Sequence, residues 1–191
     1  MLVEGVARAH GRAVENAILN GNSSAPSGLA DFAAEHVGGR RDISDGDLVS
    51  ATNLLNMRKE MGKYGLNPAD VTYIVSSASY YDLLSDSAFQ TLDEVGSDLA
   101  VRVTGTIGAV FGSPVVVSEE FPADNTAGNM AALAVYNRNY VIPRLRGVQV
   151  EQDYEVMNQR RVIVATQSLG FEEIVAGAGA DQPSVKITFV A

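Results

Sequence analysis

The amino-acid sequence predicts a protein of the α+β class, and three patterns support this prediction. Apolar residues recur at three- and four-residue spacing near the start of the chain, which is typical of an amphipathic helix. Short apolar runs bounded by Gly and Pro follow, and apolar and polar residues alternate between positions 148 and 156. The runs and the alternation indicate strands, so we expect helices and strands together in this chain of 191 residues.

The first element is predicted to be a helix over residues 2–19. Its apolar stripe consists of Val3, Val6, Ala13, Val14, Ala17 and Ile18. Asn20-Gly21-Asn22 ends the pattern, whereas no Ser, Thr, Asp or Asn precedes it to cap the first N–H groups. We therefore expect the sequence to begin within a helix. Residues 23–39 are rich in Ser, Gly, Ala and Pro, and they are predicted to form a long surface loop.

A second helix is predicted after Ser44-Asp45-Gly46-Asp47, which has the form of a helix-starting cap. Its apolar face comprises Leu48, Ala51, Leu54, Leu55 and Met61. Gly62 and Gly65 mark the end of the pattern. The cap and the two glycines make this the most clearly delimited helix in the sequence.

Short strands and turns are expected through the middle of the chain. A turn at 67–70 precedes a strand at 71–75 and a brief helix through Leu84, which Ser77 or Ser79 can cap. Further strands are predicted at 101–106, 115–117 and 131–136, with a loop at 122–128. The run Val115-Val116-Val117 is expected to be a buried strand.

The clearest two-residue alternation lies late in the chain. Val148, Val150, Tyr154 and Val156 face one way, and Gln149, Glu151, Asp153 and Glu155 face the other. Residues 161–166 supply a second strand, so we predict a long antiparallel hairpin with one solvated face. After a break at 177–181, the alternation of Val185, Ile187 and Phe189 predicts a closing strand.

The composition argues against several classes of function. The net charge of −9 disfavours tight binding to nucleic acid, because that affinity comes from basic groups that displace counterions. The basic pairs Arg40-Arg41 and Arg160-Arg161 are too local to reverse this balance. No stretch approaches the ~20 consecutive apolar residues of a membrane span. The absence of cysteine excludes thiol chemistry and cysteine-ligated zinc.

No motif indicates an enzyme, a cofactor site or a metal centre. His10 and His36 are the only histidines, and without cysteine they cannot assemble the usual transition-metal ligand sets within one subunit. The glycines between 105 and 112 match neither the dinucleotide fingerprint nor the P-loop. Acidic pairs such as Glu119-Glu120 and Glu172-Glu173 are interpreted as solvated surface. We therefore predict no catalytic, cofactor-binding or metal-binding residues.

Four segments in order carry a resemblance to a known family. They are residues 14–22 with the Asn-Gly stop, residues 66–71 followed by Tyr80-Tyr81-Asp82-Leu83-Leu84, residues 111–118 with Gly-Ser-Pro-Val-Val, and residues 148–166. In this order the chain resembles the C-terminal portion of the major capsid proteins of tailed phages, which have the Hong Kong 97-type fold. The N-terminal arm and extended loop of that family have no counterpart here, and no crosslinking lysine can be matched.

The resemblance implies a domain division. Residues 1–22 would be the end of the spine helix in the peripheral domain, 23–146 the axial domain, 147–172 the peripheral-domain hairpin, and 173–191 a closing strand that returns to the axial domain. It also implies that the protein is no enzyme and needs no cofactor. The expected function is that of a structural subunit, which assembles as hexamers and pentamers into an icosahedral head enclosing double-stranded DNA.

The implied partners are identical subunits, with scaffold or decoration proteins as further candidates, and the implied location is the virion, assembled in the host cytoplasm. Segments 23–41 and 122–129 are candidate contacts within a capsomer, and charges on the hairpin are candidates for contacts with adjacent capsomers. The candidate residues are Arg40, Arg41, Asp124, Asn125, Glu151, Asp153 and Arg160.

Two other readings fit the same sequence. An encapsulin-like compartment shell would share the fold and would be marked by a cargo-binding pocket. A small hydrolase or binding domain could build its site from Asp, Glu and Tyr without a sequence signature. A deep pocket lined by carboxylates with perturbed pKa values would favour this second alternative.

Overall fold

The computed structural model describes residues 2–21, 27–35, 43–44, 47–86, 108–121 and 126–190. The chain divides into two compact units. The helix–ribbon unit comprises Met1–Asp31 and Tyr140–Ile174, and the sheet unit comprises Phe32–Asn139 and Val175–Ala191. Helices and strands both occur, which confirms the α+β prediction.

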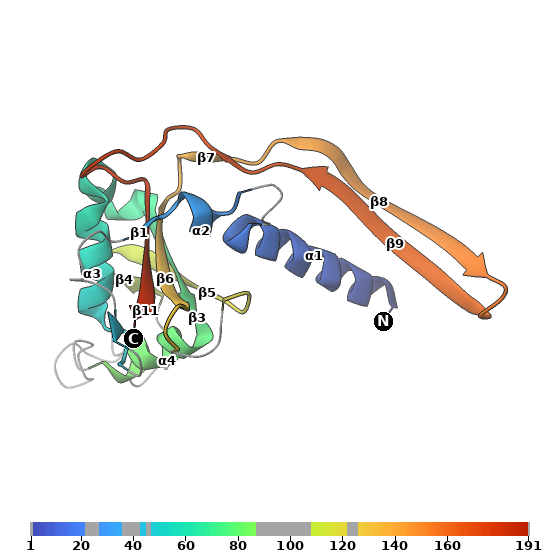
Figure 1. Ribbon diagram of the computed structural model, residues 1–191, viewed down its shortest axis with the longest axis horizontal. Helices are drawn as coiled ribbons and strands as arrows, with labels where there is room; N and C mark the ends of the chain where they lie inside the picture. The colour runs from blue at the N-terminus through green and yellow to red at the C-terminus, as the bar shows by residue number, and fades with distance from the viewer. Residues whose placement is uncertain are drawn as a thin grey trace. The chain divides into compact units, whose positions relative to one another are not determined.

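The sheet unit is built on a mixed sheet with the strand order β1-β11-β6-β3-β5-β4 (Figure 1). β1 pairs with β11 at Val185 and Lys186, and β2 pairs with β11 farther along, at Phe189 and Val190. The strands are Ala34–Glu35 (β1), Ile43–Ser44 (β2), Val71–Ser76 (β3), Ala109–Val110 (β4), Ser113–Ser118 (β5), Met130–Tyr136 (β6) and Ser184–Val190 (β11). β6 runs antiparallel to both β3 and β11, whereas β3 and β5 are parallel. The predicted strands at 71–75 and 131–136 are confirmed.

The core of the sheet unit is formed by buried residues of the sheet and of the helices α3 (Ala51–Glu60) and α4 (Ser77–Ser85), which pack together. α3 contributes Leu54 and Met57, and β3 contributes Tyr73, all of which have 0% exposed surface. The alternating residues of β11 complete the core and are Val185, Ile187 and Phe189, each 1% exposed. The predicted closing strand is therefore confirmed, because its apolar side faces the core.

α3 begins later than the sequence predicted. Its N-cap is Ser50, whose hydroxyl accepts a hydrogen bond from the backbone N–H of Asn53, whereas Ser44 lies in β2. The segment before the helix is held extended because the Asp82 carboxylate accepts from Val49 N at 3.2 Å and the Asp86 carboxylate accepts from Ala51 N at 2.7 Å. Leu48 consequently lies outside the helix and is 62% exposed.

Other local predictions also need correction. The segment predicted as a loop at 23–39 contains a short helix, α2 (Leu29–Phe32), followed by β1. Ser76, and neither Ser77 nor Ser79, caps α4, because its hydroxyl accepts from Ser79 N at 3.1 Å. The turn at 67–70 is a 3₁₀ helix, η2 (Pro68–Asp70), preceded by another, η1 (Gly62–Gly65). The strand predicted at 101–106 lies outside the described residues.

β5 is a strand as predicted, but the expectation that it is buried is wrong. Val116 and Val117 are 50% and 41% exposed. β5 pairs with β3 along one edge, and β4 covers its other edge only at Ser113 and Pro114. An apolar run predicts a strand, but what packs over the strand decides its burial.

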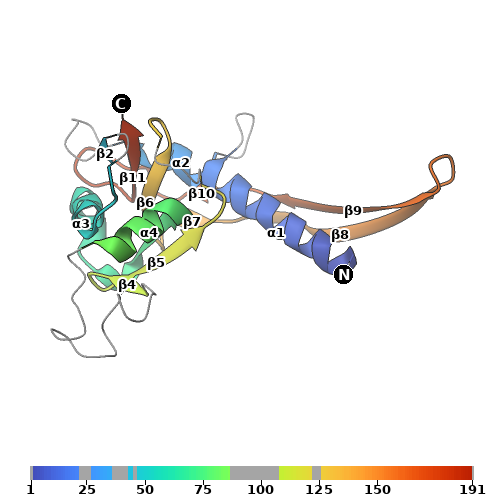
Figure 2. The same ribbon diagram turned by 90° about the horizontal axis from the view of Figure 1, so that it is seen from below.

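The helix–ribbon unit contains one long helix beside a two-stranded antiparallel ribbon. The helix is α1 (Leu2–Asn20), and the ribbon consists of β8 (Arg144–Glu155) and β9 (Arg160–Leu169). β7 (Tyr140–Val141) pairs with β10 (Glu172–Glu173) next to the ribbon. Figure 2 shows α1 along the inner part of the ribbon, whose turn projects beyond the start of the helix. The predicted first helix and the predicted hairpin are confirmed.

The ribbon is more exposed than a hairpin with one solvated face. Val150 and Tyr154, on the face expected to be apolar and covered, are 56% and 55% exposed. Every described β8 residue except Glu155 is exposed. The expectation of a single solvated face is therefore wrong for most of β8, because α1 covers only part of one face.

Candidate assembly surfaces

The register of the ribbon decides which side chains share a face. Residues directly opposite each other in an antiparallel pair point to the same side. The charged face therefore consists of Gln149, Glu151, Asp153 and Glu155 on β8 and Arg160, Val162, Val164 and Thr166 on β9. The helix-side face consists of Val150, Gln152 and Tyr154 on β8 and Arg161, Ile163 and Ala165 on β9.

The charged face contains the three hairpin residues that the sequence indicated as contacts. Glu151 and Asp153 are exposed. Arg160 is exposed too, but its Nε donates to Glu155 Oε2 within the same ribbon. Arg160 therefore already has an ion-pair partner, whereas Glu151 and Asp153 form no ion pair within the described residues.

The ribbon turn presents two apolar side chains at its end. Val156 is 73% exposed and Met157 is 95% exposed. Asn158 Nδ2 donates to Glu155 Oε1 at 2.6 Å, and Gln159 N donates to Val156 O at 3.3 Å. These hydrogen bonds and the Glu155–Arg160 ion pair hold the turn, so the exposed apolar residues project from an ordered support. Met157 is not among the contact residues predicted from the sequence, although an apolar pair in a turn between two strands is an available signal.

A groove lies between α1 and the helix-side face of the ribbon. It has a volume of about 400 Å³ and is lined mainly by apolar side chains, with no carboxylate among them. The lining residues are Val6, Ala7, His10, Val148, Val150, Gln152, Ile163 and Ala165. The His10 ring nitrogen Nε2 lies 2.8 Å from Gln167 Oε1. His10 is thus part of the contact between helix and ribbon, in agreement with a structural role.

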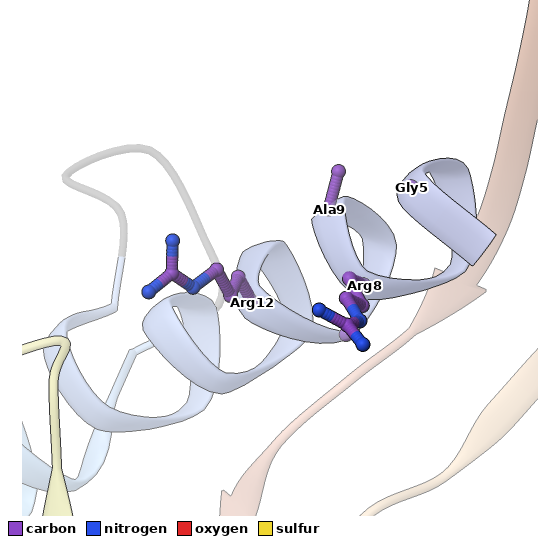
Figure 3. Close-up of a pocket in the computed structure, with 5 residues that line it drawn as sticks. Gly5, Arg8, Ala9 and Arg12 are labelled. Atoms are coloured by element: carbon purple, nitrogen blue, oxygen red, sulfur yellow. The ribbon is translucent and has the colours of Figure 1, made fainter. Parts of the chain in front are cut away.

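The opposite side of α1 is polar and open. Figure 3 shows the side chains of Arg8 and Arg12 extending from the helix, with Gly5 and Ala9 beside them. Together with Gly11 these residues line a depression of about 650 Å³. Arg8 forms an ion pair with Glu4 at 2.8 Å. Because one helix supplies the whole lining, the depression is a feature of the surface and not an enclosed binding site.

The remaining candidate contacts fall largely outside the described residues. Arg40, Arg41, Asp124 and Asn125 are among the residues whose placement the structure does not describe. The described end of segment 122–129 is tied to the sheet, since Gly128 N donates to Phe189 O at 2.7 Å and Phe189 N donates to Asn129 O at 2.9 Å. The contact role of both candidate loops stays a prediction.

The described residues with shifted pKa values lie away from the groove and the depression. No group of three or more His, Asp or Glu side chains in this part of the chain could hold a metal ion. Burial raises the pKa of Tyr73, but this residue has 0% exposed surface and cannot reach a substrate. Burial and the neighbouring charge of Glu172 raise the pKa of Glu173, which lines neither the groove nor the depression. No described helix is long and apolar enough to span a membrane.

Comparison with known proteins shows similarity to phage capsid proteins. The model of the phage capsid family matches residues 1–178. The chain is 36% identical over 172 residues to the major capsid protein of Escherichia phage T5, and the match covers 88% of this chain and 37% of that protein. The chain thus spans little more than a third of the length of this curated relative.

Solved capsid structures share the fold. The capsid of an empty GTA particle matches 100% of this chain and 65% of its own chain, with a TM-score of 0.67 at 17% identity. A structure of Mycobacterium phage Che8 matches 83% of this chain and 54% of its own, with a TM-score of 0.60 at 19% identity. The chain belongs to the phage capsid family and has the Hong Kong 97-type fold.

Proposed function

We propose that this chain is the shell-forming part of a phage major capsid subunit, which assembles as hexamers and pentamers into an icosahedral head around double-stranded DNA. The observation that carries the proposal is the exposed ribbon. Its residues Leu145, Val148, Val150, Tyr154, Val156, Met157 and Val164 are 47–95% exposed. Monomeric proteins rarely leave so much apolar surface uncovered, whereas shell subunits cover such surface with neighbours.

The assignment of the two domains is proposed from the two compact units. We assign the helix–ribbon unit to the peripheral domain and the sheet unit to the axial domain. The boundaries of the units differ from those proposed from the sequence, because the described residues 27–31, 140–146 and 173–174 belong to the helix–ribbon unit. In this assignment the ribbon supplies contacts between capsomers, and segments 23–41 and 122–129 supply contacts within one capsomer.

The partners and the location follow from the same proposal. Identical subunits are the main partners, scaffold or decoration proteins are secondary ones, and the protein resides in the virion after assembly in the host cytoplasm. The net charge of −9 suits a container for DNA, because a lining that bound phosphates tightly would hinder packing and release. Tight specific binding to nucleic acid is accordingly not part of the proposed function.

The test is negative-stain microscopy with mass analysis of the gene product that carries this sequence, expressed alone and with the products of neighbouring genes. We expect closed shells, or rings of five and six subunits. A persistent monomer under all of these conditions would contradict the proposal.

A further inference from the structure

An irregularity in the ribbon brings a positive charge onto the charged face. Arg144 pairs with Leu169, Arg146 with Ser168 and Gln149 with Thr166, so β8 contains extra residues between these pairs. Ser168 lies on the same side of β9 as Thr166 and Val164, because alternate residues share a face. Arg146 therefore lies on the charged face, and Arg144 lies on the helix-side face.

The charged face then has separated charges along its length. Arg146 lies at the inner end, and Glu151 and Asp153 lie toward the turn. None of these three residues forms an ion pair within the described part of the chain. The partners of Arg146 and Asp153 on β9, Ser168 and Val162, are six residues apart, so at a rise of roughly 3.3 Å per residue Arg146 and Asp153 are about 20 Å apart, too far to pair within one copy.

The same face also exposes apolar surface. Val164 is 47% exposed and lies opposite Glu151. A two-stranded ribbon is only marginally stable in water without a covering layer, and α1 contacts the opposite face. A second layer over the charged face would therefore stabilise the ribbon. The positions of the charges determine which surface can form that layer.

We propose that the charged face docks on the charged face of a second copy of this chain, with the two ribbons antiparallel about a twofold axis near Gln149. Arg146 of each copy then lies over the partner's Glu151 and the partner's Asp153. The arrangement is isologous, since the same patch serves both copies. It rests on the proposed function, because it names one contact through which capsid subunits would associate.

The geometry follows from the positions of the charges. On β9, the partner of Arg146 lies two positions from Thr166, and the midpoint of the partners of Glu151 and Asp153 lies three positions away on the other side. Reversal of the ribbon about an axis near Gln149 therefore exchanges positive and negative sites. A parallel arrangement would place like charges over each other, which is unfavourable. Val164 lies within two residues of Thr166, the partner of Gln149, so the second copy also covers it.

Site-directed crosslinking tests the face and the axis. The chain has no cysteine, so single cysteines are unambiguous markers. Gln149→Cys should form covalent dimers with a bismaleimide that spans about 10 Å, the usual separation of packed sheets. Val150→Cys is the matched control, because it lies one residue away on the helix-side face. Equal crosslinking of both variants, or crosslinking of Val150→Cys alone, would overturn the proposal.

Charge exchange tests the pairing. Arg146→Glu should weaken dimerisation about tenfold in sedimentation equilibrium at low salt, as should Glu151→Arg with Asp153→Arg. The variant that combines all three changes should recover most of the affinity, because it exchanges the signs and keeps the pairing. Arg144→Glu, on the other face, is the control and should change dimerisation little. Circular dichroism establishes that each variant folds.

Shell formation and dimerisation are separate measurements, and together they distinguish an error in the ribbon contact from an error in the proposed function. If the gene product forms shells and Arg146→Glu neither alters the shells nor weakens dimerisation, the inference is wrong and the capsid proposal stands. If the wild-type protein forms neither shells nor dimers, both are wrong. Loss of dimerisation in Arg146→Glu without recovery in the combined variant also contradicts the pairing.

Discussion

Tyr73 in the sheet unit and Tyr154 in the ribbon are both strand residues, but they have opposite surroundings. Tyr73 has 0% exposed surface in a core that α3 and α4 complete, whereas Tyr154 is 55% exposed on a ribbon that α1 covers only in part. The sheet unit thus contains the residues that stabilise it. The ribbon leaves apolar surface exposed, and a two-stranded ribbon of this kind has little stability of its own.

The largest expected effect is a difference in the free energy of unfolding between two Leu→Ala variants, one in the sheet unit and one in the ribbon. Leu54→Ala removes a side chain with 0% exposed surface and should lower the free energy of unfolding by about 3 kcal/mol. Leu145→Ala removes one that is 89% exposed and should change it by less than about 0.5 kcal/mol. Urea denaturation measures both. Equal losses would show that the ribbon has a covered core of its own.

The next largest effect on stability is expected at Arg58, which forms hydrogen bonds with several segments of the sheet unit. Its guanidinium donates to Gly65 O at 2.6 Å, Phe111 O at 3.0 Å and Leu66 O at 3.3 Å. Arg58→Ala should destabilise the protein by about 2 kcal/mol, because hydrogen bonds from a charged donor are lost. Lys59→Ala, an exposed neighbour on α3, is the control. A similar loss in both variants would show that helix propensity, and not the carbonyl contacts, is responsible.

A smaller effect tests the corrected start of α3. Ser50→Ala should lower the free energy of unfolding by about 1 kcal/mol, since the backbone N–H of Asn53 loses its side-chain acceptor at 3.4 Å and keeps only the Ser50 backbone oxygen at 3.0 Å. Ser50→Asp should retain most of the stability, because aspartate is an equally good N-cap. Thermal denaturation distinguishes the variants, and an unchanged Ser50→Ala protein would refute this cap.

The smallest expected effect depends on pH. Burial, and then the charge of Glu172, raises the pKa of Glu173 in the folded protein, so ionisation is easier in the unfolded chain. Wild-type stability should therefore fall as pH rises from the ordinary carboxyl pKa through the raised value. Glu173→Gln should be more stable above that window by about 0.5 kcal/mol or less, because solvent screens a partly exposed group.

Urea denaturation at a series of pH values measures this difference between wild type and Glu173→Gln. The difference should vanish below the ordinary carboxyl pKa, where Glu173 is protonated in both states. Glu172→Gln is the control and should give a smaller increase, since it removes only the secondary cause. A wild-type protein more stable than Glu173→Gln at neutral pH would reverse the sign and contradict the argument.

The sequence predicted the elements whose residues repeat with a clear period. The spacing in residues 2–19 predicted α1, and the alternation of Val185, Ile187 and Phe189 predicted the strand β11. The family resemblance from four ordered segments was also confirmed. These patterns are local and continuous along the chain, so they can be recognised without knowing which residues are neighbours in the folded protein.

Predictions that depended on distant partners were less successful. Val115-Val116-Val117 was expected to be buried, but burial depends on what packs over the strand. The start of α3 was misplaced because the carboxylates of Asp82 and Asp86, more than 30 residues away in sequence, bind the segment before it. The face of Arg146 could not be predicted, since strict alternation places it with Val148 and the irregular register moves it.

The position of β11 has a consequence for synthesis of the protein. β11 lies between β6 on one edge and β1 and β2 on the other, although its residues follow all the other strands in the sequence. A ribosome adds on the order of 5–20 residues per second, so β6 waits on the order of seconds for its neighbour. During that time the edge of β6 exposes unpaired backbone N–H and C=O groups, which chaperones or other strands can bind, and the sheet unit is completed only when β11 has been made.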